Sequence, residues 1–380
     1  MLGQRLKLAR SAAGLSLRGL AERIGNRVTA QAIGKYERDE SVPSSGVLIA
    51  LADALSVSVD YLAGDQEMAL ENLEFRKKSL TSKREEMQVE AKVLHLLERY
   101  LMVEEFLGLP SLDWDKPREA PYPVVNDPSE ADRAAYSLRL HWGIGLDPIP
   151  NLVELMEERG IKVLSCALGV VRRPHGRRNI DGLMARVRRA GKSVVPVLVV
   201  NESHWGERQR LTMAHELGHM VLEVGAKVDD ETAAFRFAGA FLMPAEVLWA
   251  AMGKHRTSIG WSELFALKKL FGVSVQALTY RCKDLGIFGP TLFRRLFNEF
   301  SRLGWRKPPY QEPYAMPGEE PQRFERLCFR ALAEDAISEA KAAELLETSV
   351  HELNQRMEEP PDLEYDEANE GAGLRHAHPD

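Results

Sequence analysis

The first 64 residues alternate short stretches of helical apolar periodicity with tight turns. The pattern predicts five short helices, within residues 2–14, 15–25, 29–40, 42–55 and 58–64. Ser16 and Thr29 stand where helix N-caps are expected, and Gly14 and Gly25 stand where helices end. Short helices joined by brief turns are what a helix-turn-helix domain requires, so we predict an all-α domain over residues 1–64.

Residues 65–128 have a different pattern, which is charged and helical in period and ends in a proline-rich boundary at 117–128. An apolar stripe runs along the helical part and comprises Leu94, Leu97, Leu101 and Val103. We interpret the region as a helical linker of one helix or a helical pair. Either the stripe lies on the next domain, or it forms a dimer contact.

Residues 129–290 predict a small α+β domain, because a few strands lie between groups of helices. The β-branched, turn-bounded stretches predict strands at 161–168, 180–187 and 193–201. Amphipathic helices are expected at 129–143 and 151–160, along the run that carries His215, and over 229–252 with an end near Pro244. More helices are expected up to residue 290.

The remaining chain is predicted to be a helical C-terminal region at 291–357 and an acidic tail at 358–380. The tail carries eight acidic residues against one arginine, a composition typical of disorder. Residues 334–357 have a helix-turn-helix rhythm again. We interpret them as a structural helix pair, since the pattern is too weak to indicate a second DNA-binding domain.

Composition narrows the class of protein. Hydrophobic residues make up 44% and charged residues 28%, which is the profile of a soluble globular protein, and a chain of 380 residues is expected to form two or three domains. We find no apolar run of membrane-spanning length and no N-terminal apolar core, so we expect a cytoplasmic protein with no membrane partner. The three scattered cysteines fit a reducing compartment. The net charge of −6 argues against a chain that coats nucleic acid as a whole, although residues 1–64 hold eight basic and six acidic residues.

The segment "RQRLTMAHELGHMVLEV" (208–224) holds the candidate chemistry. His215 and His219 are four residues apart, so a helix places both on one face. An H-E-x-x-H pattern on a helix is typical of zinc hydrolases, in which two imidazoles bind the ion and the glutamate is the general base. We therefore predict His215 and His219 as metal ligands and Glu216 as the catalytic base.

A third protein ligand must come from elsewhere in the chain. The candidates from the residues alone are Glu223, Asp229, Asp230, Glu231 and His204. Helix rotation turns Glu223 away from His215. Glu231 begins the next helix, whose apolar face is expected to pack back against the first.

The segment "RQRLTMAHELGHMVLE…DDETAAFRFAGAFLMP" closely resembles the ImmA/IrrE family of zincin-like metallopeptidase domains, and the resemblance spans roughly residues 130–290. It implies that Glu231 is the third ligand and Glu216 the base. One departure is Phe235, where many members carry a polar Asn or Asp. His204 and Arg208 precede the helix and are either candidates for binding a substrate carbonyl or ordinary surface residues.

Residues 5–64 resemble the XRE (Cro/phage-repressor-like) helix-turn-helix family, on "LSLRGLAERIG", "TAQAIGKYERDESVPS" and "LIALADALSVSVDYLAG". The resemblance implies that the third helix enters the major groove of a double-stranded DNA operator. It assigns base contacts to Thr29, Ala30, Gln31 and Lys35, and phosphate contacts to Arg18, Arg27 and Arg38. Leu17 departs from the polar Gln of many relatives. XRE-type domains usually bind as homodimers, although the domain could instead be a protein-interaction module.

Together these features lead to one hypothesis and its alternatives. We predict a DNA-binding transcriptional regulator that binds one zinc ion per chain. Manganese or iron in place of zinc is an alternative that the ligand set also allows. Its peptidase domain is expected to cleave a repressor- or antitoxin-like partner, or its own linker, in a stress, prophage or toxin–antitoxin response. The main alternative is a DNA-binding regulator whose peptidase-like domain senses a ligand or partner without proteolysis. A further alternative is a metallopeptidase that uses the small domain only to recruit its substrate.

Overall fold

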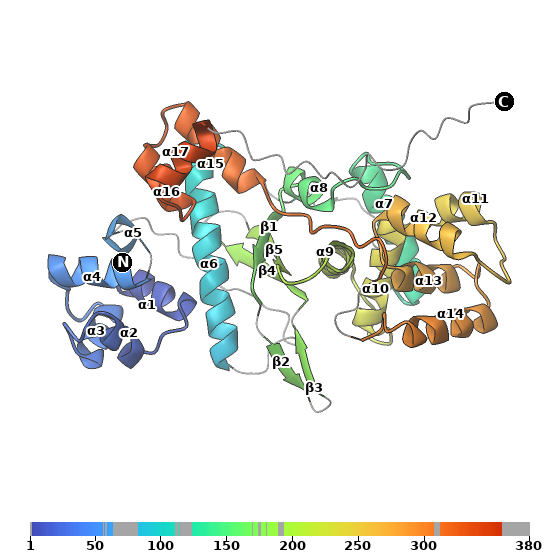
Figure 1. Cartoon of the computed structure of the whole chain (residues 1–380), viewed down its shortest axis with the longest axis horizontal. Coiled ribbons are helices and arrows are strands. Elements are labelled where there is room, and N and C mark those ends of the chain that lie inside the picture. The colour runs from blue at the N-terminus through green and yellow to red at the C-terminus, as the bar shows by residue number, and fades with distance from the viewer. Residues whose placement is uncertain are drawn as a thin grey trace, which may run out of the picture. The chain divides into compact units, whose positions relative to one another are not determined.

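The computed structural model describes most of the chain (Figure 1). The described residues are 2–55, 57, 59–63, 83–110, 114, 124–168, 170–173, 176–179, 181–188, 194–307 and 312–358. Much of the predicted linker and almost all of the predicted acidic tail lie outside this set. The chain divides into two compact units, Met1–Leu327 and Cys328–Asp380, and each is described by itself.

The N-terminal region is the predicted bundle of short helices. These helices are α1 (Leu2–Ala12), α2 (Leu17–Arg23), α3 (Ala30–Glu37), α4 (Ser45–Leu55) and α5 (Val59–Ala63). Both predicted N-caps are confirmed: the Ser16 hydroxyl accepts the amide of Gly19 at 2.9 Å and the Thr29 hydroxyl accepts the amide of Ala32 at 3.2 Å. The core of the bundle includes Leu20, Ile33, Leu51 and Leu62, all fully buried.

Over the described residues the linker region forms one long helix, α6 (Lys83–Phe106). The predicted apolar stripe is buried in the unit, since Leu97, Leu101 and Val103 are fully enclosed. The buried carboxylate of Glu104 binds Lys162, on the first strand of the sheet, and Arg323, the latter at 2.6 Å. The helix therefore contacts the α+β domain, as one of the two predicted alternatives states, and it also packs against α1 of the N-terminal bundle, where Arg5 pairs with Glu98 at 2.9 Å. The alternative of a dimer contact stays a prediction.

The central sheet has three strands in the order β1-β5-β4. Strand β1 (Lys162–Cys166) runs parallel to β5 (Val194–Asn201), and β4 (Gly182–Arg188) runs antiparallel to β5. All three strands were expected. A separate antiparallel hairpin, β2 (Val170–Arg173) with β3 (Gly176–Asn179), was not expected, because its arginine-rich sequence lacks the apolar alternation that indicates a strand.

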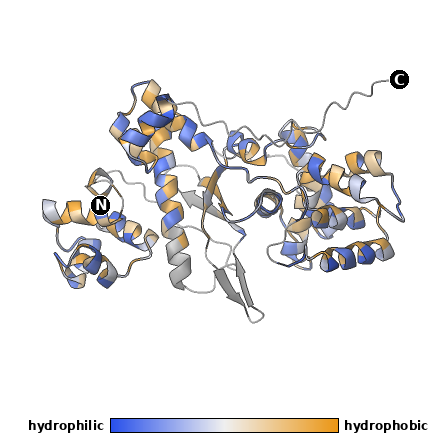
Figure 2. Ribbon diagram, in the orientation of Figure 1, coloured by the Kyte–Doolittle hydropathy of each residue, from blue (hydrophilic) through white to orange (hydrophobic). Residues whose placement is uncertain are grey.

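Helices cover the sheet and extend the domain beyond it (Figure 1). They are η1 (Pro128–Glu130), α7 (Ala131–His141), α8 (Leu152–Glu158), α9 (Gly206–Val221), α10 (Asp230–Leu242), α11 (Ala245–Met252), α12 (Trp261–Phe271), α13 (Val275–Asp284) and α14 (Pro290–Arg302). The expected break at Pro244 is confirmed, because α10 ends two residues before it and α11 starts directly after it. Apolar and polar residues alternate along these helices (Figure 2), as amphipathic elements require. The prediction of a helical domain followed by an α+β domain is confirmed.

A segment without helix or strand at 312–319, called the strap from here on, contacts the beginning of α9 and was not predicted. The buried carboxylate of Glu312 accepts from the Lys268 ammonium at 3.1 Å and from the Val275 amide at 2.8 Å. The backbone of Met316 exchanges hydrogen bonds with the beginning of α9, while Glu319 binds the guanidinium of Arg210. The strap therefore fixes the first two turns of the helix that carries both histidines.

The second unit is helical, in agreement with the prediction for this region. Helix α15 (Arg323–Ala333) leads into it, and α16 (Glu339–Leu345) and α17 (Val350–Glu358) follow. The two last helices bury Ala342, Ala343, Leu345 and Leu353. Within the described residues of the chain, no single helix has both the length and the hydropathy of a membrane span; α10 and α11 reach those values only together, across a 60° bend.

Candidate functional site

The two histidines lie on α9, which packs against α10 at close range. Gly218 makes this approach possible: a Cβ at that position would lie 3.0 Å from the Phe237 ring and 3.2 Å from the Ala234 carbonyl oxygen. Phe237 and Ala234 are themselves fully buried on the inner face of α10. The first turn of α10 is thereby held over the face of α9 that carries His215 and His219.

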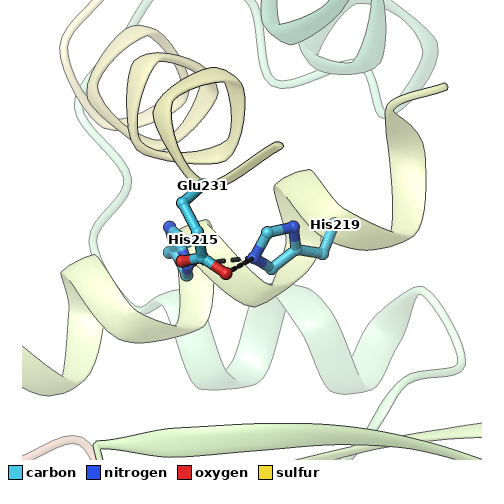
Figure 3. A group of neighbouring side chains, drawn as sticks. All are labelled: His215, His219 and Glu231. Carbon is cyan, nitrogen blue, oxygen red and sulfur yellow. Dashed lines mark hydrogen bonds and ion pairs between the residues drawn. The ribbon is translucent and has the colours of Figure 1, made fainter. Parts of the chain in front are cut away.

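Three side chains converge at this crossing. The Nε2 atoms of His215 and His219 are 3.0 Å apart, and the carboxylate of Glu231 lies 3.3 Å from the first and 3.7 Å from the second. Figure 3 shows Glu231 reaching from α10 toward both imidazoles of α9. A metal site needs at least three His, Cys, Asp or Glu side chains whose ligand atoms lie close together. Among the described residues, His215, His219 and Glu231 form such a group, with ligand atoms within 4.8 Å of one another.

These distances fit a tetrahedral metal site. Zinc–nitrogen and zinc–oxygen bonds of about 2.0–2.1 Å at tetrahedral angles separate the ligand atoms by about 3.3 Å. The three separations bracket that value, and the donors are two imidazoles and one carboxylate. This ligand set suits zinc and also admits manganese or iron, and it leaves a fourth position for water or substrate.

The surroundings of the two imidazoles differ. The Nδ1 atom of His219 lies 3.5 Å from a carboxylate oxygen of Asp230, whereas the His215 ring lies against Phe235 with ring centroids 4.1 Å apart. The side chain of His219 is 3% exposed and that of His215 is 10% exposed, whereas the side chain of Glu231 is 44% exposed. The group is therefore open to solvent on the α10 side. Glu216, one residue after His215, is partly exposed on the same helix.

The other acids proposed as a third ligand have different positions. Glu223 is exposed in the loop after α9, and Asp229 caps α10 by accepting the Thr232 amide at 2.9 Å. Asp230 lies beside the Nδ1 atom of His219, on the side of that ring opposite the Nε2 atom that faces Glu231. Glu231 is thus the acid that faces both Nε2 atoms.

His204 and Arg208 form a separate cluster around Asp181, next to the start of β4. One carboxylate oxygen of Asp181 lies 2.9 Å from His204 Nε2 and 2.6 Å from an Arg208 guanidinium nitrogen. Burial works to raise the pKa of Asp181, but the hydrogen bond from His204 and the charge of Arg208 outweigh it and hold that pKa below its ordinary value. Arg208 is seven residues before His215 on α9, which corresponds to about 10 Å along the helix at a rise of about 1.5 Å per residue. Binding of a substrate carbonyl by these two residues stays a prediction.

The predicted DNA-reading face belongs to α3 and its neighbours. Gln31 and Lys35 are exposed on α3, Ala30 is partly exposed, and the hydroxyl of Thr29 caps the same helix. The buried side of α3 is fixed by Ile33, which is fully enclosed in the bundle core. The helix therefore presents short and polar side chains outward at its beginning, the end that enters the major groove in helix-turn-helix domains.

The three arginines predicted to contact phosphates are all exposed. Arg18 pairs with Glu22 at 3.3 Å, and Arg38 pairs with Glu40 at 2.6 Å. The hydrogen bond from Arg38 holds the pKa of Glu40 below its ordinary value. A phosphate would have to displace these acids from Arg18 and Arg38, whereas Arg27 lies in the turn between α2 and α3.

Comparisons with known proteins agree with both resemblances. Residues 156–283 match the family model described as the IrrE N-terminal-like domain, of the peptidase family M78, and residues 6–62 match the helix-turn-helix family model. The HTH-type transcriptional regulator ImmR of Bacillus subtilis (strain 168) is 40% identical over 73 residues, which are 19% of this chain and 54% of that protein. The chain thus spans about half the length of this curated relative. Residues 6–62 of the present chain therefore form an XRE-type helix-turn-helix domain, and residues 156–283 form an IrrE-like peptidase-family domain.

Two features of the site escaped sequence reasoning. The pairing of Asp181 with His204 and Arg208 joins residues more than 20 positions apart, and no local spacing indicates it. The proximity of Asp230 to His219 could have been expected, because an acid directly before Glu231 shares the first turn of α10. Such a partner orients a metal-binding imidazole through its second ring nitrogen.

Proposed function

We propose that this protein is a cytoplasmic DNA-binding transcriptional regulator whose second domain is a zinc-dependent endopeptidase. Its substrate would be a repressor- or antitoxin-like partner or its own linker, and its setting a stress, prophage or toxin–antitoxin response. We further propose that it binds its double-stranded operator as a homodimer. The similarity to ImmR, which is named a transcriptional regulator, supports the proposal of a regulator. The match to the IrrE-like domain of peptidase family M78 supports the proposal of a peptidase.

The residues of the chain have distinct proposed roles in hydrolysis. His215, His219 and Glu231 would hold one zinc ion, which supplies the positive charge that acidifies water and polarises a peptide carbonyl. Glu216, next to His215 on α9, would take the proton from the attacking water. The same carboxyl group would then give that proton to the amide nitrogen as the C–N bond breaks, so that the products are a carboxylate and an amine.

The observation that carries this proposal is the convergence of two imidazoles from α9 and one carboxylate from α10 within 3.0–3.7 Å, where α9 also bears Glu216. Two structural histidines on a largely buried helix would not need a partly exposed acid from another element facing both of their Nε2 atoms. A divalent ion explains why all three point to one place.

The test uses the full chain and its Glu216→Gln variant. Both proteins should contain about one zinc ion per chain, because the substitution leaves the three ligands in place. The wild type should cleave its protein partner, whereas the variant should keep the partner uncleaved and co-purify with it. Zinc-loaded wild type that cleaves neither a co-purified partner nor its own linker would contradict the peptidase proposal.

The same variant separates the proposal from the sensor alternative. If a reporter promoter is regulated normally by Glu216→Gln but not by Gln31→Ala, the domain acts without proteolysis. If Glu216→Gln abolishes the response while DNA binding in vitro is unchanged, proteolysis is the regulatory step.

A further inference from the structure

Phe235 is an unusual member of α10. The other large apolar side chains of this helix face inward, and Phe237 and Phe241 are fully buried. Phe235 is 51% exposed, so about half of its ring contributes nothing to the core. A single exposed apolar residue is common on protein surfaces and needs no explanation by itself. This one is informative because of what its other face contacts.

The covered face of Phe235 lies on a proposed metal ligand. Its ring centroid is 4.1 Å from that of His215, at an angle of 38°. Phe235 also follows Glu231 by four residues, so both project from the same side of α10. Because Glu231 is 44% exposed, the uncovered part of the ring adjoins the solvent-open side of the ligand group.

The two sides of the ligand group differ in chemistry. On the His215 side lie Phe235 and, one helical turn earlier on α9, the partly exposed Leu211. On the His219 side lies the carboxylate of Asp230, 3.5 Å from the ring. A peptide that approaches the proposed metal therefore has an apolar surface on one side and an acidic surface on the other.

We propose that Phe235, together with Leu211, forms an apolar wall that determines specificity by binding a large apolar side chain next to the scissile bond. The inference rests on the proposed peptidase function. Neighbouring Cα atoms are only 3.8 Å apart, so a substrate whose scissile carbonyl lies at the ligand group brings an adjoining side chain to the Phe235 ring. The substrate class is then a protein segment with leucine, phenylalanine or a similar residue at the cleavage site.

The test measures binding rather than turnover. The probes are short peptide hydroxamates, whose metal-binding group is constant and whose adjoining side chain is that of glycine, leucine or phenylalanine. Zinc-loaded full-length wild type should bind the leucine and phenylalanine compounds about 10-fold or more tightly than the glycine compound, a discrimination typical of apolar pockets. Phe235→Asn should reduce this preference to less than about two-fold, and Phe235→Leu should retain most of it.

The matched control is Leu270→Asn on α12, since Leu270 is 50% exposed and also apolar. It should keep the wild-type preference, and all variants should bind zinc with wild-type affinity. Equal binding of the three probes by the wild type, no binding of any probe, or an unchanged preference in Phe235→Asn would overturn the inference. Cleavage of the protein partner is measured separately. A preference for the apolar probes without any proteolysis would refute the proposed peptidase function but support binding of apolar side chains by Phe235. Proteolysis without such a preference would support the peptidase function and refute the apolar wall.

Discussion

At the residue scale, the acid that faces both histidines is the most informative single position. Glu231 is 44% exposed, so it contributes little packing, and the proposed role in metal binding accounts for its position next to both Nε2 atoms better than a role in stability does. Glu223 offers a comparison, because it is also an exposed acid close to α9 in sequence but is absent from the ligand group.

We predict that Glu231→Gln weakens zinc binding by more than about 100-fold, since even residues that only surround metal ligands change affinity about 10–100-fold. Folding should be nearly unchanged because the side chain is half exposed. Zinc content after dialysis against a weak chelator measures the effect, with Glu223→Gln as the control that keeps its metal. Full retention of zinc by Glu231→Gln would exclude Glu231 as a ligand.

Glu157 on α8 is a buried carboxyl group that the proposed chemistry does not use. Burial raises the pKa of Glu157 from its ordinary value of 4.5 to about 7, although the charge of Arg323 and a 3.3 Å hydrogen bond from Tyr100 oppose the rise. Since the raised pKa belongs to the folded state, its contribution to stability is fully present below about pH 4.5. That contribution is lost as the pH rises through about 7.

The corresponding prediction concerns Glu157→Gln, which removes this titration. The free energy of unfolding of the variant minus that of the wild type should increase by about 1–3 kcal/mol from pH 5 to pH 8. Thermal denaturation at both pH values measures the change, and Glu158→Gln, at the exposed neighbouring position, is the control. A difference between variant and wild type that is the same at both pH values would contradict this account.

At the scale of elements, the contact between α9 and α10 decides whether the ligands meet. It depends on Gly218, where even a Cβ would lie 3.0 Å from Phe237 and 3.2 Å from the Ala234 oxygen. Gly239 on α10 is different, because a Cβ at that position would lie 3.5 Å from its nearest neighbour, the Cδ atom of Arg281, which is an ordinary van der Waals distance.

We therefore predict opposite effects at these two glycines. Gly218→Val should separate the helices, lower stability by about 1–3 kcal/mol and weaken zinc binding, because overpacking forces the backbone apart. Gly239→Ala should be neutral or slightly stabilising, because alanine is favoured over glycine inside a helix by up to about 1 kcal/mol. Calorimetry and zinc titration distinguish these cases, and normal zinc affinity in a folded Gly218→Val protein would mean that the contact does not position Glu231.

At the scale of the whole molecule, charge is divided unevenly along the chain. The chain has a net charge of −6, yet residues 1–64 hold eight basic and six acidic residues. Binding to DNA should therefore depend on a few local contacts and be sensitive to salt.

On duplexes selected from random sequence, we predict that Arg27→Ala weakens binding to all sequences and reduces the slope of log affinity against log salt by about 1. Gln31→Ala should instead cost about 1–3 kcal/mol on the selected sequence only, since it would remove a base contact. Arg294→Ala, at an exposed site on α14, is the control for general charge. An unchanged salt slope in Arg27→Ala would remove Arg27 from the phosphate contacts.

Much of the fold could be predicted because it depends on interactions between residues that are close together in the sequence. The N-caps at Ser16 and Thr29, the helix break at Pro244 and the three strands of the central sheet follow from local propensity and periodicity. The β2–β3 hairpin and the strap could not be predicted. The hairpin has no apolar alternation, and Glu319 of the strap is 109 residues from Arg210, its partner on α9.

The candidate site divides in the same way. The sequence by itself predicted one helix for His215, Glu216 and His219 from its apolar periodicity, and it predicted that the two histidines share a side of that helix because they are four residues apart. The residues alone left several acids open as the third neighbour, and the family resemblance implied Glu231. Only the tertiary structure could place the Glu231 carboxylate within 3.3 and 3.7 Å of the two imidazoles. The physical reason is that Glu231 reaches the imidazoles through the close packing of α9 on α10 at Gly218, and the exposure of Phe235 beside them follows from the same crossing.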